Sequence, residues 1–174
     1  RHEWIDLDNV GIFGHSGGGF MSTAALLTYP NFYTAAASSA GNHDNNIYNK
    51  WWGETHNGVI KKEKTKKDKE GNETTTVTWD GKVKTNQSLA NNLKGHLLLT
   101  HGTIDNNVHP ANSMRVADEL MKAGKRFDYM PIPGSRHGYG SKRDYYEKLM
   151  WYFFAEHLLG DYRNNVDMDL PDGN

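Results

Sequence analysis

Three polar side chains at separate places along the chain could together carry nucleophilic catalysis. Ser16 lies in the segment GHSGG, which matches the pattern Gly-x-Ser-x-Gly and stands between an apolar run and helix-forming residues. A serine in that setting is displayed at a sharp turn between a strand and a helix. Because a serine hydroxyl is a poor nucleophile at neutral pH, it needs a base, and the base needs an orienting group.

Candidates for both groups follow later apolar runs. Asp105 lies in HGTIDNNV directly after the run 96–100, and His137 lies in PGSRHGYG after the run 126–133. In α/β-hydrolases the acid and the base follow the serine in this order, at the carboxyl ends of later strands. His137 alone would be read as an ordinary surface histidine, but the three agreeing placements predict a Ser-His-Asp triad.

The elements that must position this triad alternate along the chain. Four apolar runs are short enough to be buried strands and are predicted as such: residues 10–13, 32–41, 96–100 and 126–133. Three segments place apolar residues at helical spacing and predict helices: residues 21–28, 111–124 and 146–158. Ser141 with Asp144 resembles a capping box for the last helix. The alternation indicates an α/β fold with a parallel sheet flanked by helices.

Residues 59–85 interrupt the alternation. This segment is charged, then threonine-rich, and carries turn signals at Gly71-Asn72 and Asp80-Gly81, so it predicts an exposed β-hairpin insertion. Its stretch 61–70 has six lysines against three acids, which favours a solvated surface over a binding patch. We expect one partial domain over residues 1–160 and a loosely attached tail over 161–174.

Composition excludes several classes of function. The net charge of the 174 residues is −1, so no general attraction to nucleic acid is expected. The absence of cysteine excludes disulfides, a thiol nucleophile and thiolate metal sites. No apolar run approaches the roughly 18 residues that span a bilayer, and we expect no membrane segment in this chain.

A zinc site is the alternative interpretation of several histidines. His101, Asp105 and His109 recur at four-residue spacing, and His43 with Asp44 could join them. That spacing aligns ligands only on a helix, whereas the glycine after His101 and the strand-end turn argue against a helix there. We therefore expect no metal and no other cofactor.

The motifs GHSGGG, LLLTHGTIDNNVHP and PGSRHGYG together closely resemble the catalytic domain of prolyl oligopeptidase-family serine peptidases, especially the dipeptidyl-peptidase IV-like branch. WIDLDNVGIFGHSGGG is similar to that family's lead into the nucleophile strand, and LANNLKGHLLLTHG to its lead into the aspartate strand. The resemblance covers nearly the whole chain apart from the insertion and the tail. It implies the C-terminal part of an α/β-hydrolase domain that acts on peptides.

The resemblance also implies roles for individual residues. Ser16 would be the nucleophile, His137 the general base and then acid, and Asp105 its orienting group. Four further residues would contact the substrate: the backbone N–H of Gly17 at the oxyanion, Asn107 at the substrate's N-terminal residue, and Val108 and Tyr48 around the residue before the cleaved bond. The sequence departs from the family at Gly17, where tyrosine is common, and in part of the aromatic pattern of residues 40–52.

In the family, several strands and a β-propeller precede the nucleophile strand. These would bring a side-chain oxyanion donor and the acidic residues that read a free N-terminus, so we expect this segment alone to be nearly inactive. Without those strands, residues 10–13 would form an exposed edge through which the chain self-associates. The resemblance is compatible with a periplasmic or secreted location, and no residue here indicates one.

Three functions remain open from the sequence. The leading hypothesis is a serine peptidase that removes dipeptides or short N-terminal units through an acyl-enzyme. An esterase or acylaminoacyl-peptidase on the same fold is the second, because the fold does not fix the substrate. A non-catalytic binding domain is the third, although an intact Ser, His and Asp argue against it.

Overall fold

The structure is a computed structural model, and it describes residues 2–163 and 167–168. The chain divides into two compact units, one formed by residues 1–43 with 86–174 and one by residues 44–85. The first unit holds the sheet, and the second holds the insertion. Much of the predicted tail, residues 164–166 and 169–174, lies outside the described residues.

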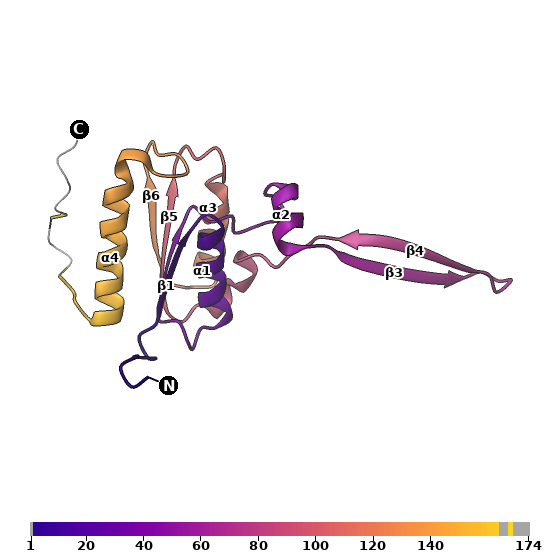
Figure 1. Cartoon of the computed structure of the whole chain (residues 1–174), viewed down its shortest axis with the longest axis horizontal. Helices are drawn as coiled ribbons and strands as arrows, with labels where there is room; N and C mark the ends of the chain where they lie inside the picture. The colour runs from indigo at the N-terminus through magenta and orange to yellow at the C-terminus, as the bar shows by residue number, and fades with distance from the viewer. Residues whose placement is uncertain (1, 164–166, 169–174) are drawn as a thin grey trace. The chain divides into compact units, whose positions relative to one another are not determined.

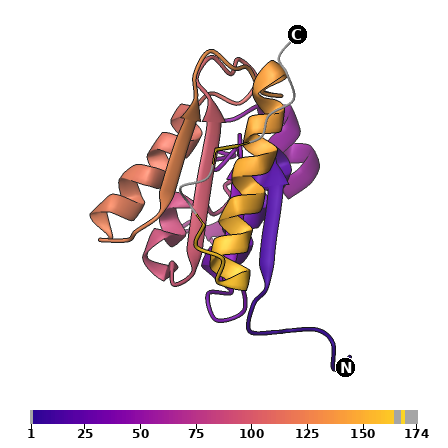
Figure 2. The same cartoon turned by 90° about the vertical axis from the view of Figure 1, so that its left-hand side faces the viewer.

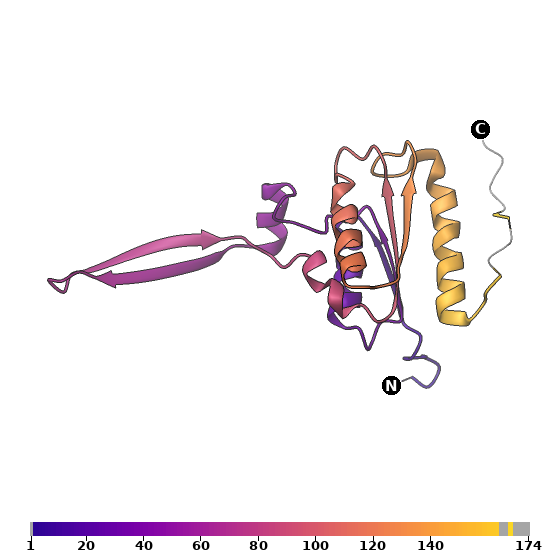
Figure 3. The ribbon, with the colours of Figure 1, turned by 180° about the vertical axis from the view of Figure 1, so that it is seen from behind.

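The first unit is built on a parallel four-stranded sheet. Its strands, in spatial order, are β1 (Gly11–His15), β2 (Ala35–Ser39), β5 (His96–Gly102) and β6 (Asp128–Ile132). Helices α1 (Gly17–Thr28) and α3 (Ala111–Lys122) cover one face, and α4 (Arg143–Leu159) covers the other (Figure 1). Figure 3 gives the view of the same layers from behind. The α/β class predicted from the alternation of elements is confirmed.

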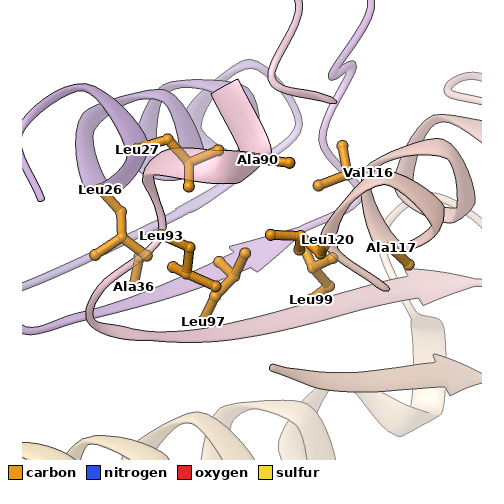
Figure 4. Packing of buried hydrophobic residues seen from close by; sticks show 10 residues of the cluster. All are labelled: Leu26, Leu27, Ala36, Ala90, Leu93, Leu97, Leu99, Val116, Ala117 and Leu120. Carbon is orange, nitrogen blue, oxygen red and sulfur yellow. The ribbon is translucent and has the colours of Figure 1, made fainter. Parts of the chain in front are cut away.

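Successive side chains of a strand point to opposite faces of the sheet, and on β5 the side chains on both faces are apolar and packed. Leu97 and Leu99 of β5 pack against α1 and α3 in the core drawn in Figure 4, which also includes Leu93 beside the short 3-10 helix η1 (Gln87–Asn92). Leu98, between the two, packs against α4 instead. A buried central strand therefore reads as a continuous apolar run rather than an alternating one.

The α4 face is a close contact made possible by small residues. Helix α4 runs along this face of the sheet (Figure 2). Ala35 and Ala37 of β2 are fully buried and pack with the buried Met150 and Phe153 of α4. On β1, a Cβ at Gly11 would lie 2.8 Å from Leu158 Cδ1, so a larger residue there would have to displace that side chain of α4. The predicted apolar face of the last helix is confirmed.

The start of that helix differs from the prediction. Ser141 lies in a short 3-10 turn, η2 (Gly140–Lys142), and the α-helix begins only at Arg143. The residue before the helix is Lys142, which makes no side-chain capping bond. The predicted capping box of Ser141 and Asp144 is therefore wrong, because the tight turn that follows Tyr139 places Ser141 outside the helix.

The second unit contains the insertion. Helix α2 (Lys50–Asn57) precedes an antiparallel hairpin of β3 (Ile60–Lys67) and β4 (Glu73–Asp80), which confirms the predicted hairpin. The hairpin turn is closed by Asp68 Oδ1, which accepts from the N–H groups of Glu70 and Asn72, both at 2.9 Å. Helix α2 was not predicted, since its two tryptophans and its glycine do not give a helical apolar stripe.

No helix in the described part of the chain is long and apolar enough to cross a membrane. The expected absence of a membrane segment agrees with this finding for the described residues.

Strand β1 lies at one edge of the sheet, and this generates a first prediction. Phe13 on this strand is 64% exposed, and an unpaired apolar edge invites pairing with another chain. We expect the isolated chain to self-associate at high concentration, and we expect Phe13→Lys to reduce the association measured by light scattering. Trp79→Lys, which removes a similarly exposed aromatic from the hairpin, is the control. A monomeric native chain, or equal effects of both substitutions, would contradict the assignment to β1.

A buried histidine after β2 generates a prediction about pH. His43 is fully buried, its Nδ1 lies 2.9 Å from Asn86 Nδ2, and a Cβ at Gly41 would lie 2.6 Å from its Cε1. Burial lowers the pKa of His43 to about 3, with His101 nearby adding to the effect. His43 is therefore neutral in the folded chain, while the unfolded chain takes up a proton once the pH falls below 6.5, the ordinary histidine value.

Folding stability must then fall as the pH is lowered from 6.5 toward 3, because the unfolded state binds the extra proton. One histidine contributes a slope of about 1.4 kcal/mol per pH unit. His43→Gln should remove that share of the slope in urea denaturation between pH 6 and pH 4, whereas His56→Gln, an exposed histidine, should not. Equal slopes in the native chain and in His43→Gln would show this account to be wrong.

Candidate active site

Ser16 stands in a strained backbone conformation between β1 and α1. Its φ of 60° and ψ of −120° are rare for a residue with a side chain. Its N–H donates to the Ser39 carbonyl at 2.8 Å, and its own carbonyl accepts from Phe20 N–H at 3.0 Å. Ser16 occupies the N-cap position of α1 but makes no side-chain capping bond. The hydroxyl is thus not committed to the helix end.

Two of the surrounding glycines are required by close backbone approach. A Cβ on Gly14 would lie 2.3 Å from the carbonyl carbon and oxygen of Gly18, and one on Gly19 would lie 2.5 Å from the Ser39 oxygen. Real Cβ atoms do not approach backbone this closely, so larger residues at either position would force the turn open. The glycine pattern around Ser16 is therefore the consequence of a tight strand-to-helix turn.

Asp105 and His137 are joined directly. Asp105 follows β5, is 3% exposed, and its Oδ2 lies 2.7 Å from His137 Nδ1. Its other oxygen, Oδ1, accepts from the N–H groups of Asn107 at 2.9 Å and Val108 at 3.0 Å. The structure thus brings together the predicted acid and base, which are 32 residues apart in the sequence.

The electrostatics keep this carboxylate charged. Burial alone raises the pKa of Asp105, but the hydrogen bonds from His137 and from the N–H groups of Asn107 and Val108 together outweigh it, so the net pKa lies below the ordinary value. An ionised Asp105 can only accept, so His137 Nδ1 carries a proton. In the neutral tautomer that has its proton on Nδ1, the other ring nitrogen, Nε2, is the acceptor and can act as a base.

His101 is a residue whose place at the site the sequence did not reveal. It is fully buried, and its Nε2 lies 2.8 Å from the Val108 carbonyl and 3.2 Å from Asp105 Oδ2. Its Nδ1 lies 2.8 Å from Ser113 Oγ on α3. Burial is the main cause that lowers the pKa of His101, so it is a neutral donor to the aspartate loop.

These contacts also bear on the zinc alternative. Both ring nitrogens of His101 are engaged within the protein, and the described residues contain no group of three or more side chains that could hold a metal ion. His101 lies on β5 and Asp105 in the loop that follows it, so the two are not aligned on a helix.

Gly102 is a second residue whose role at the site no sequence pattern reveals. A Cβ there would lie 2.3 Å from the Ser135 oxygen and 2.6 Å from the Arg136 oxygen. The backbone of the histidine loop therefore packs directly on the end of β5. Two further bonds hold this contact: Ile104 N–H donates to the Ser135 oxygen at 3.1 Å, and Gly134 N–H to Thr103 Oγ1 at 2.8 Å.

The remaining predicted residues lie as follows. Gly17 is the first residue of α1, where N–H groups lack partners within the helix. Asn107 is exposed, and Val108 is fully buried. Tyr48 belongs to the unit of residues 44–85, in which its ring packs edge-on against Trp52 with ring centroids 5.9 Å apart.

In this chain β1 turns sharply through the strained Ser16 into α1. Together with the parallel sheet, this turn identifies the fold as the C-terminal part of an α/β-hydrolase. This assignment agrees with a solved structure, dipeptidyl peptidase 4 of Porphyromonas gingivalis, which superposes on 89% of this chain with a TM-score of 0.71 at 24% identity. The model of the prolyl oligopeptidase family matches residues 1–161. The chain belongs to that family of serine peptidases.

Curated relatives carry related names. A dipeptidyl peptidase 4 of Trichophyton rubrum is 33% identical over 129 residues, and human dipeptidyl peptidase 8 is 28% identical over 160 residues. These alignments cover 74% and 91% of this chain but only 15% and 17% of the relatives. The chain spans about a fifth of the length of the Porphyromonas structure. It therefore corresponds to a small part of each protein that it resembles.

The close approach at Gly102 generates a prediction. Gly102→Ala should push the histidine loop away from β5, and overpacking of this kind costs about 1–3 kcal/mol in the free energy of unfolding measured with urea. The matched control is Gly138→Ala in the same loop, where an added Cβ meets no atom within 4 Å. Equal stability of the two variants would contradict the contact as described.

Proposed function

We propose that this chain is the part of a serine peptidase in which Ser16, His137 and Asp105 carry out the reaction through an acyl-enzyme. The observation that carries the proposal is the 2.7 Å hydrogen bond between His137 Nδ1 and Asp105 Oδ2, made by loops that follow β6 and β5. The strained Ser16 follows β1 of the same parallel sheet, so all three groups lie at its carboxyl edge.

In the first step, Ser16 Oγ attacks the carbonyl carbon of the peptide bond while His137 Nε2 takes the hydroxyl proton. Asp105 holds the Nδ1 proton of His137 and stabilises the imidazolium that forms. The negative charge develops on the carbonyl oxygen, and the N–H of Gly17 at the start of α1 would donate to it. Collapse of this intermediate breaks the C–N bond, and His137 returns the proton to the leaving amine.

In the second step, water attacks the acyl group on Ser16 and His137 removes its proton. The acid product leaves, and the proton returns to Ser16 Oγ. The lowered pKa of Asp105 keeps its charge throughout this cycle. No group outside the triad, the Gly17 N–H and water is needed to balance either step.

The substrate is proposed to be a peptide cut near its N-terminus, as the names of the relatives suggest for those proteins. Asn107, which is exposed, would contact the N-terminal residue of the substrate. Val108, which is fully buried, would form the back of the pocket for the residue before the cleaved bond. This part of the proposal rests on family resemblance.

Intact mass after treatment with a fluorophosphonate probe tests the triad. We expect one adduct on the native chain, none on Ser16→Ala, and one on the control Ser141→Ala, whose serine lies in the turn before α4. We also expect His137→Ala to lower the labelling rate. An adduct that persists on Ser16→Ala, or its absence from the native chain, would contradict the proposal for this segment.

Turnover separates the substrate classes. We expect slow hydrolysis of Xaa-Pro or Xaa-Ala amides by this chain alone, because loss of one oxyanion donor costs about 10²–10³ in rate. Preference for simple esters or for acylated N-termini would favour the esterase or acylaminoacyl-peptidase alternative. Hydrolysis of peptides at the rate of a complete enzyme would contradict the expected near-inactivity of the segment.

A further inference from the structure

A row of polar side chains crosses the carboxyl end of the sheet on its α4 side. The parallel register places His15 of β1 beside Ser39 of β2, and Ser39 beside Thr100 of β5. Neighbours in register point to the same face of a sheet. On this same face Ala35, Ala37 and Leu98 pack against α4, so the row of polar side chains lies next to that apolar surface, toward the carboxyl ends of the strands.

Tyr139 closes this row from above. Its hydroxyl oxygen lies 2.8 Å from Ser39 Oγ, which donates to it, and 2.9 Å from Thr100 Oγ1. The residue is only 3% exposed, and its ring packs edge-on against Tyr146 of α4 with centroids 5.1 Å apart. Two central strands and one helix therefore fix the position of a single side chain.

Tyr139 is also part of the loop that carries the proposed base. Its N–H donates to the Arg136 carbonyl at 3.2 Å, which closes a turn around His137 and Gly138. Its φ of 64° is unfavourable for a residue with a Cβ and persists only where surrounding contacts impose it. The anchored hydroxyl supplies that constraint, and Ser135 Oγ adds a bond to the Tyr139 carbonyl at 3.3 Å.

His15 completes the arrangement on the other side of the base. Its ring centroid lies 4.7 Å from that of His137 and 5.8 Å from that of Tyr139. The Ser39 proton is used in the bond to Tyr139, so His15 Nδ1, 2.8 Å from Ser39 Oγ, must be the donor in that contact. In the neutral form of His15 the proton then lies on Nδ1 while the contact is kept.

The surroundings favour the same neutral form. Desolvation, together with the nearby His137 and Arg143, lowers the pKa of His15 to about 4, against an opposing effect of Asp105 and a small further lowering by His101. An imidazole that stays neutral beside the base does not repel the charge that the base gains when it accepts a proton.

We infer that Tyr139 is a positioning residue for His137. Its buried hydroxyl, hydrogen-bonded to Ser39 and Thr100, holds the loop that carries His137 against the ends of β2 and β5. The neutral imidazole of His15 lies beside that of His137. The inference rests on the proposed function of His137. It assigns no contact between Tyr139 and the substrate. The hydrogen bonds that join Tyr139 to Ser39 and Thr100 affect the reaction only through the position of the His137 imidazole.

Tyr139→Phe tests the inference, because it keeps the ring and removes only the hydroxyl. We expect the rate of fluorophosphonate labelling of Ser16 to fall on the order of tenfold, since small misplacements of a reacting group carry large costs. We also expect the far-downfield proton signal of the His137–Asp105 hydrogen bond to weaken or shift in the NMR spectrum. Thr100→Val, which removes the second hydroxyl at nearly constant volume, should change both readouts in the same direction.

The matched control is Tyr129→Phe on β6, where a buried tyrosine hydroxyl has no hydrogen-bond partner among the described residues. It should leave the labelling rate and the proton signal unchanged. If Tyr139→Phe labels at the native rate with an unchanged signal, the inference is wrong. If the native chain does not label at all, the proposed function fails, and the His137 proton signal in Tyr139→Phe still decides whether the hydroxyl positions the imidazole.

Discussion

The buried carboxylate of Asp105 is the constraint on which much of the structure depends. A charge removed from water must be matched by donors that point at it, or the group would give up its charge. Asp105 is matched by two N–H groups of its own loop and by His137, with His101 close by. Each of these donors belongs to a segment whose path is then fixed, so the loops after β5 and β6 cannot move independently of the charge.

The same requirement explains why so little space is left between these loops. Short hydrogen bonds to a single carboxylate bring two backbones together, and Gly102 is the point at which they meet. At the other end of the edge, Gly14 and Gly19 allow the turn that carries Ser16 to pass close to β2. The site is therefore specified by positions where a side chain is impossible as much as by the side chains that it uses.

The sequence was sufficient for the order of the sheet strands and of the helices that cover them, because buried strands and amphipathic helices leave strong local patterns. It was also sufficient to expect Ser16, Asp105 and His137 at one edge, since parallel strands end on the same side. It did not reveal the row of His15, Ser39 and Thr100, because partners in register are separated by 24 and 61 positions and depend on pairing that no local pattern encodes.

Smaller errors have local causes. Ser141 has the residue type and spacing of a helix cap, but the left-handed Tyr139 just before it directs the chain into a 3-10 turn. Helix α2 gave no apolar stripe because it buries no residue within the structure. The four-residue spacing of His101 with Asp105 and His109 suggests only a metal ligand. A buried histidine that supports a loop by hydrogen bonds has no sequence pattern of its own.

In the connection between β2 and β5, the residues that precede and follow the insertion are hydrogen-bonded to each other. The side chain of Asn46 pairs with both main-chain groups of Val83, donating to its oxygen at 3.0 Å and accepting from its nitrogen at 3.1 Å. Because the chain thus leaves and returns at one point, a change in the number of residues between these two positions, 36 in this chain, would not alter the distance that the connection must span. Substitutions or a change of length within this segment would therefore alter the surface of the protein and leave the sheet unchanged.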